Sequence, residues 1–305
     1  MNRRSETPSR REPASEWLEI TITVDEVAHD ALGSFLFDMG CTGIVTGDEG
    51  DQTLKAYLPF DKVLEDTRQK IARFLKTLPA IFSLQEPPFL HFSKLADQDW
   101  HVAWRQFFRP TRVSSNLMVL PEWESMPDDI SGHVIRMDPG PAFGTGYHAT
   151  TRMCLRAMEK VARSGPWTLL DVGTGSGILA LYAAMLGAGE IVAIDNDPEA
   201  LRWARRNILL NRLSEAIETT STPVEKLDGQ FSVVCANLIL ETVERLLPAI
   251  SARTAMGGWI ILSGILREQV PTVMQRIEAL EIQHCETLYE GEWACLMARN
   301  MGAHA

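Results

Sequence analysis

The chain has 305 residues, of which 45% are hydrophobic and 23% charged, and this is typical of a globular protein with room for two domains. The sequence contains no apolar run of about 18 residues and no apolar stretch near its start, so it predicts neither a membrane span nor a secretory signal. A net charge of −11 argues against a broad nucleic-acid surface and favours a basic partner. We expect the protein to be cytoplasmic, because its cysteine pattern favours reduced thiols.

Residues 1–16 show no apolar periodicity, and we expect them to form a disordered tail. Residues 17–24, WLEITITV, alternate apolar and polar side chains, which is typical of a strand with one buried face. Helical spacing follows, with Asp25 as the expected N-cap and Gly40 as the expected stop.

Two short strands, a second helix and a further strand are predicted next. The strands lie near 43–46 and 53–58, the helix near 62–78, and the last strand runs from Ile81 or Phe89 to Phe92. This order of elements is the ferredoxin-like plan. Residues 17–92 are therefore predicted to form a small α+β domain.

Residues 93–132 are predicted to be a connector rich in aromatic side chains, namely Trp100, Trp104, Phe107, Phe108 and Trp123. The stretch DQDWHVAWRQFFRP has the pattern of a short amphipathic helix. Its aromatic residues can pack between two domains, which we favour, or form one wall of a ligand site.

From His133 onward, strand and helix patterns alternate, and this predicts a doubly wound α/β sheet. Besides the glycine-rich unit described next, we expect strands at 216–220, 231–237 and 259–263, helices at 241–254 and 268–280, and final strands at 282–290 and 294–299. The last two strands suggest an antiparallel pair. The five cysteines form no C-x-x-C pair, which favours buried, reduced thiols over a metal site or disulfides.

The most informative stretch is LLDVGTGSGILALYAAMLGAGEIVAIDND, residues 169–197. Gly173 and Gly175 follow a predicted strand, permit positive φ and let a ligand approach the backbone closely. The helix that begins near Ser176 offers free N–H groups to a carboxylate. The spacing is G-x-G-x-G, whereas the dinucleotide fingerprint would place a glycine at Ile178.

Asp195 ends the next predicted strand, about 20 residues after Gly173, where a carboxylate can accept hydrogen bonds from both hydroxyls of a ribose. NAD-binding folds use such an acid too, so Asp195 alone does not separate NAD from S-adenosylmethionine (AdoMet). Asp197 is better explained as the N-cap of the following helix.

Residues 137–151, MDPGPAFGTGYHATT, form a second glycine-rich loop before a predicted helix. Such a loop can cover a flat ligand, with Phe143 offering an aromatic face and Thr151 a hydroxyl. His148 could serve as a general base, but we favour a role in structuring the loop.

Together, MDPGPAFGTGYHATT, DVGTGSG, AIDNDP, ANLIL and LSGIL closely resemble the PrmA family, and the resemblance covers most of the chain. Members of that family methylate the eleventh protein of the large ribosomal subunit with AdoMet. The resemblance implies a seven-stranded class I methyltransferase sheet at residues 133–305, and a substrate-recognition role for the ferredoxin-like domain. We expect a monomer that methylates amino groups of this basic ribosomal protein, with no membrane or nucleic acid as direct partner.

The resemblance implies cofactor contacts at four positions, which are Thr151, Gly173, Asp195 and Asn237. Phe143 and Gly175 complete the expected cofactor site. Asn237 ends a predicted strand and is also expected to orient the substrate amine. No metal is expected, because the methyl group of a sulfonium is already activated.

Two segments depart from the family pattern. Ala149 stands where the family usually has the proline of H-P-T-T. After Asn237 the sequence reads LILETVERL, in place of a small-residue I-L-A-x-P-L. Leu240 and Glu241 therefore change the rim of the expected active site.

Other functions stay open to different degrees. A methyltransferase for another protein or a small amine would share every cofactor motif. An NAD-dependent oxidoreductase is disfavoured by Ile178 and the FGTG loop, and a non-catalytic AdoMet-binding protein by the joint presence of Thr151, Asp195 and Asn237. Nucleic acid methylation is disfavoured by the net charge and by the absence of an N-P-P-[YF] run after Ala236.

Overall fold

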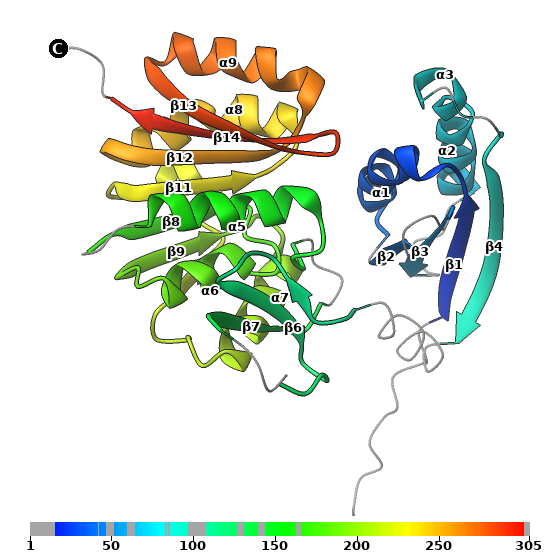
Figure 1. Cartoon of the computed structure of the whole chain (residues 1–305), viewed down its shortest axis with the longest axis horizontal. Helices are drawn as coiled ribbons and strands as arrows, with labels where there is room; N and C mark the ends of the chain where they lie inside the picture. The colour runs from blue at the N-terminus through cyan, green and yellow to red at the C-terminus, as the bar shows by residue number, and fades with distance from the viewer. Residues whose placement is uncertain are drawn as a thin grey trace, which may run out of the picture. The chain divides into compact units, whose positions relative to one another are not determined.

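The computed structural model describes residues 16–41, 43–46, 52–59, 65–82, 84, 86–96, 108–126, 131–139, 144–162 and 166–301. The chain divides into two compact units, residues 1–108 and residues 109–305. Each unit has its own hydrophobic core, and Figure 1 labels the helices and strands of both.

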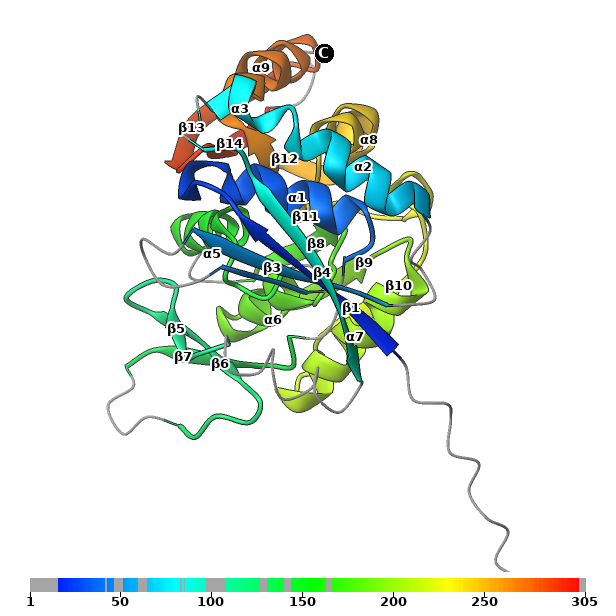
Figure 2. The same cartoon turned by 90° about the vertical axis from the view of Figure 1, so that its right-hand side faces the viewer.

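The first unit contains a four-stranded antiparallel sheet in the order β2-β3-β1-β4. Its elements are β1 (Glu16–Thr23), the 3-10 turn η1 (Glu26–Ala28), α1 (His29–Asp38), β2 (Gly43–Thr46), β3 (Thr53–Pro59), α2 (Glu65–Leu75), α3 (Leu78–Phe82) and β4 (Phe89–Ala96). Figure 1 shows β1 and β4 side by side, and in Figure 2 β4 lies in front of β1. This strand order is the ferredoxin-like arrangement that the sequence predicts.

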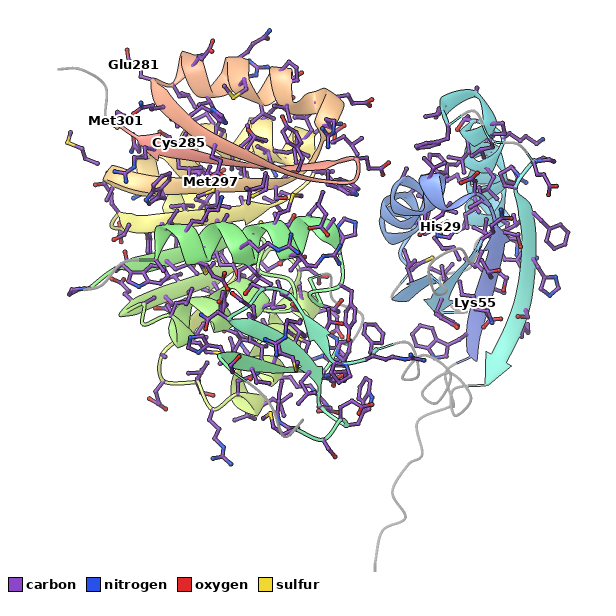
Figure 3. All side chains as sticks on the ribbon, viewed as in Figure 1. His29, Lys55, Glu281, Cys285, Met297 and Met301 are labelled. Atoms are coloured by element: carbon purple, nitrogen blue, oxygen red, sulfur yellow. The ribbon has the colours of Figure 1, made fainter. Side chains whose placement is uncertain are left out.

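The alternating sequence of β1 buries one face of the strand. The buried residues pack with α1 and α2 and are Leu18, Ile20 and Ile22. Glu19 projects from the opposite face, where it accepts a hydrogen bond from the Tyr57 hydroxyl at 3.1 Å and pairs with Lys55, labelled in Figure 3.

A helix cap and a turn explain where the first unit matches the prediction and where it differs. The Asp25 side chain accepts a hydrogen bond from the N–H of Val27, so it caps the turn that leads into α1. The second helix stops at a turn in which the Thr77 hydroxyl donates to the carbonyl of Phe74. A new short helix, α3, then begins, so Ile81 is helical and the last strand starts at Phe89.

The second unit is built on a seven-stranded sheet in the order β10-β9-β8-β11-β12-β14-β13. Its elements are β5 (Thr111–Arg112), β6 (Leu117–Pro121), β7 (His133–Met137), α5 (Ala149–Val161), β8 (Thr168–Val172), α6 (Ile178–Met185), β9 (Glu190–Ile194), α7 (Pro198–Leu210), β10 (Glu218–Thr220), η4 (Val224–Lys226), β11 (Phe231–Asn237), α8 (Leu240–Arg253), β12 (Thr254–Leu266), η5 (Arg267–Gln269), α9 (Val270–Ala279), β13 (Ile282–Glu290) and β14 (Trp293–Asn300). The strands from β10 to β12 are parallel, and β14 is antiparallel to both of its neighbours.

Helices cover both faces of this sheet, as the prediction of a doubly wound fold requires. Side chains from α5, α6 and α7 share one core with the sheet, and those from α8 and α9 share the other. Successive residues of β11 alternate between the two cores, with Val233 and Cys235 on one side and Val234 and Ala236 on the other. Near-continuous apolar strands of this kind are typical of sheets buried on both faces.

Part of the predicted connector folds with the second unit. Strands β5 and β6 lie within residues 93–132 and join β7 in a three-stranded sheet. The predicted amphipathic helix falls outside the described residues, apart from Phe108, Arg109 and Pro110. The first unit also extends further than predicted, since β4 runs to Ala96.

No helix in the described part of the chain is long and apolar enough to cross a lipid bilayer. All five cysteines are free thiols, and four of them are buried as expected. Cys285 is exposed, contrary to the prediction, because it lies on β13 at the edge of the sheet (Figure 3).

Candidate functional site

The predicted site residues follow the carboxyl ends of the parallel strands. Gly173 follows β8, Asp195 follows β9, and Asn237 is the last residue of β11. The order of the strands reverses between β8 and β11. In open α/β sheets, ligands bind at the carboxyl edge where such a reversal occurs.

The glycine turn after β8 needs glycine for its backbone conformation. Gly173, Gly175 and Gly177 have φ values of +75°, +54° and +85°, which other residues rarely adopt. The N–H of Gly173 donates to the carbonyl of Ile194 at 2.9 Å, which ties the turn to the end of β9. A Cβ on Gly173 would lie 2.5 Å from Cδ2 of Leu238, so the turn also permits close packing against the segment after β11.

Asp195 holds the glycine turn through its carboxylate. Its Oδ2 accepts a hydrogen bond from the N–H of Gly175 at 3.0 Å, and its Oδ1 accepts one from the N–H of Asp197 at 3.0 Å. Each oxygen keeps a further lone pair, so both can still accept bonds from ribose hydroxyls. Asp197 caps α7 by accepting from the N–H of Glu199 at 2.9 Å, as predicted.

On the other side of the strand reversal, Asn237 and Thr151 lie together. The Asn237 side-chain nitrogen donates to the Thr151 hydroxyl at 3.3 Å, and Thr151 is almost fully buried in the first turn of α5. Two residues that are far apart in the sequence therefore form one polar contact, which leaves the side-chain oxygen of Asn237 as an acceptor.

His148 has a structural position at the start of α5. Its Nδ1 lies 3.3 Å from the N–H nitrogen and 2.7 Å from the hydroxyl of Thr150, and this contact caps the helix. The imidazole also packs edge-on against Trp293, with ring centroids 5.0 Å apart. Ala149 occupies the first helical position, whose N–H lacks an intrahelical partner, so alanine and proline are both compatible there.

The residues after Asn237, which form the rim of the expected site, differ in how far they are buried. The N–H of Leu238 donates to the Ser263 carbonyl at 2.9 Å, and Gly264 allows close contact because a Cβ there would lie 2.4 Å from the Leu238 oxygen. Ile239 is 51% exposed, whereas Leu240 packs partly against the core. Of the two residues that change the rim, Leu240 is therefore partly buried and Glu241 is exposed to solvent.

Two further residues of the site have no role that the sequence alone predicts. Ser176 is buried, and its hydroxyl donates to the carbonyl of Gly144 at 2.6 Å, which joins the glycine-rich loop to the glycine turn. Asp171 is buried at the end of β8, where it accepts a hydrogen bond from the Thr174 hydroxyl at 2.6 Å. Phe143, predicted to cover the ligand, lies outside the described residues.

Burial raises the pKa of the Asp171 carboxyl to about 7, and the nearby charge of Asp195 adds to the rise while the Thr174 hydroxyl opposes it. Between about pH 4 and pH 7 the folded protein keeps a proton that the unfolded chain has released. Stability therefore falls as the pH rises through this window. Above pH 7 the buried charge is fully present and its cost is largest.

We expect Asp171→Asn to flatten this part of the pH dependence. The wild-type unfolding temperature should fall relative to that of the variant between pH 5 and pH 8, by several degrees, because roughly 3 kcal/mol of stability is lost over this range. Thermal unfolding of both proteins across this range measures the difference. Parallel curves would mean that Asp171 is ionised throughout the range.

The hydrogen-bond donors and acceptors at this edge of the sheet are of the kinds that the parts of AdoMet would need. The Asp195 carboxylate suits the ribose hydroxyls, and the N–H groups at the start of α6 suit a carboxylate. Asn237 and Thr151 add neutral polar groups close to the strand reversal. In the described ranges, no group of three or more His, Cys, Asp or Glu side chains could hold a metal ion.

Comparisons with known proteins show which family the whole chain resembles. Residues 16–301 match the family model described as ribosomal protein L11 methyltransferase (PrmA). The ribosomal protein L11 methyltransferases of Pelobacter propionicus and Geobacter metallireducens are each 38% identical, over 93% and 92% of this chain and 98% and 97% of theirs. A crystal structure of the ribosomal protein L11 methylase of Lactobacillus delbrueckii subsp. bulgaricus is 34% identical, with a TM-score of 0.59 over 63% of this chain and 98% of that chain.

Proposed function

The chain belongs to the ribosomal protein L11 methyltransferase (PrmA) family, and we propose that it transfers methyl groups from AdoMet to amino groups of ribosomal protein L11. The protein is a protein methyltransferase of this family. The cofactor, the methylated groups and the roles of individual residues are our proposal. A ribosomal substrate also fits the expected cytoplasmic location.

The observation that carries this proposal is the assembly of two polar pairs on either side of the strand reversal. Asp195, which follows β9, accepts a hydrogen bond at 3.0 Å from the N–H of Gly175 in the turn after β8. Asn237, the last residue of β11, donates a hydrogen bond at 3.3 Å to the Thr151 hydroxyl. The first pair suits a ribose, and the second lies where the methyl group would be presented. The motif residues that are scattered in the sequence thus support one cofactor site.

AdoMet, when bound, supplies a methyl group on a positively charged sulfur. In this proposal the side-chain oxygen of Asn237 accepts a hydrogen bond from the substrate amine, which orients the nitrogen lone pair towards the methyl group. A lysine has an ordinary pKa of about 10.4 and must lose its proton first. Entry into a site that excludes water lowers the pKa of the amine, because desolvation opposes the ammonium form.

The transfer itself then depends on alignment rather than on acid–base chemistry. AdoMet held at this site would supply the methyl group to the amine nitrogen and would leave as the uncharged thioether, and the methylated ammonium would release a proton to solvent. Alignment of reacting atoms at near-attack distance contributes several kcal/mol to such reactions. His148 is committed to capping α5, so we assign it no proton-transfer step.

The test is a transfer assay with AdoMet labelled in its methyl group. We expect label on purified L11, and no label when Asp195→Ala replaces the wild-type protein. A cell lysate depleted of L11 is the parallel substrate. Label in the depleted lysate alone would retain methyl transfer and reject L11, and it would favour another protein or a small amine.

A further inference from the structure

Helix α7 buries a polar side chain on its apolar stripe. Leu201, Ala204 and Ile208 face the core, and Asn207 lies among them with no exposed surface. Burying a carboxamide costs free energy unless its oxygen and its nitrogen both find hydrogen-bond partners. The position of Asn207 therefore depends on the partners at both ends of its side chain.

Both partners are main-chain groups of the cofactor-binding segments. The Oδ1 of Asn207 accepts from the N–H of Asp138 at 2.8 Å, and its Nδ2 donates to the carbonyl of Ser176 at 2.9 Å. Asp138 begins the glycine-rich loop after β7, and Ser176 belongs to the glycine turn after β8. One carboxamide thus joins two segments that are separated in the sequence.

Further contacts hold the same two segments. The Ser176 hydroxyl donates to the carbonyl of Gly144 at 2.6 Å. The glycine-rich loop is therefore attached to the same turn at Gly144 as well as at Asp138. Arg206 pairs with the Asp138 carboxylate, with 2.5 Å between Nε and Oδ2. Figure 1 shows α7 beside β7 and α6, the elements that lead into the loop and out of the turn.

We propose that Asn207 is a positioning residue for the cofactor site and sets the distance between the glycine-rich loop and the glycine turn. The inference rests on the proposed use of AdoMet. Both ends of the carboxamide are occupied by main-chain partners, so Asn207 acts through these partners and not on the ligand. Its loss would leave the N–H of Asp138 and the carbonyl of Ser176 buried without their partner.

Asn211, the C-cap residue of α7 one turn after Asn207, provides a matched control. Its Oδ1 accepts from the N–H of Arg136 at 2.9 Å, and its Nδ2 donates to the carbonyls of Arg136 at 2.6 Å and of Asn207 at 2.8 Å. It therefore attaches α7 to β7 through the same chemistry. None of these bonds reaches the glycine turn or the loop from Gly144 onward.

The experiment measures AdoMet affinity by calorimetry, together with the unfolding temperature, for wild type, Asn207→Ala and Asn211→Ala. We expect Asn207→Ala to weaken AdoMet binding about tenfold or more, because a misplaced loop and turn lose ligand contacts. Asn211→Ala should lower the unfolding temperature but leave AdoMet affinity within about twofold. In steady state, Asn207→Ala should raise KM for AdoMet and leave KM for L11 unchanged.

Asn207→Asp is the second variant, for use if Asn207→Ala does not fold. It keeps the acceptor for Asp138 but loses the donor to Ser176, so it should weaken AdoMet binding as well. Wild-type affinity in a folded Asn207 variant, or equal weakening in Asn211→Ala, would overturn the positioning role. Failure of the wild-type protein to bind AdoMet would instead overturn the proposed function, and this inference with it.

Discussion

Asp195→Ala is expected to weaken AdoMet binding by about 100-fold or more. The carboxylate would accept bonds from two ribose hydroxyls, and hydrogen bonds to a charged group are worth about 1.5–3 kcal/mol each. The same substitution frees the N–H of Gly175, which Asp195 holds at 3.0 Å. The ligand contact and the shape of the glycine turn are therefore lost together, and calorimetry with AdoMet and with S-adenosylhomocysteine measures the result.

Asp197→Ala is the matched control for this prediction. It removes a carboxylate from the same loop, but Asp197 caps α7 and its side chain accepts from Glu199. Loss of an N-cap costs about 1 kcal/mol of stability, so we expect a lower unfolding temperature with AdoMet affinity within about threefold. Tight binding by Asp195→Ala would show that the ribose lies elsewhere, and it would remove the main support for the proposed cofactor site.

The strand ends and the glycine turn could be predicted because they depend on local sequence. Gly173 and Gly175 adopt positive φ, as the motif requires, and Asp195 follows a short strand whose last four residues, IVAI, are apolar and buried. The pattern FSVVCAN likewise predicts that Asn237 ends its strand, and Asn237 is the last residue of β11. Residues at the carboxyl ends of parallel strands share one edge, so their proximity follows from the topology.

Contacts that depend on tertiary packing could not be predicted in the same way. Strands β5 and β6 are short and contain no long alternating pattern, so their pairing with β7 leaves little local signal. Ile81 is β-branched, and only the turn at Thr77 shows that it belongs to a helix. Asn207 did leave a signal, because a polar residue on the apolar stripe of an amphipathic helix indicates a buried hydrogen-bonded side chain.

Removal of the first unit is expected to reduce L11 methylation strongly while cofactor binding persists. The second unit, residues 109–305, contains both of its cores, and neither core includes a described residue before Val113. A fragment of residues 109–305 should therefore fold and bind AdoMet within about twofold of the full chain. If the first unit recognises L11, its loss removes the binding that brings the amine to the site, and kcat/KM should fall about 100-fold or more.

A short lysine peptide distinguishes loss of recognition from loss of chemistry. Such a peptide cannot engage a separate recognition domain, so the fragment and the full chain should methylate it at the same low rate. Fragment 1–108 added separately should not restore L11 methylation, because recognition helps catalysis only when both units are on one chain. Full activity of fragment 109–305 on L11 would place recognition in the second unit, where Ile239 is the exposed apolar side chain next to Asn237 and Leu238.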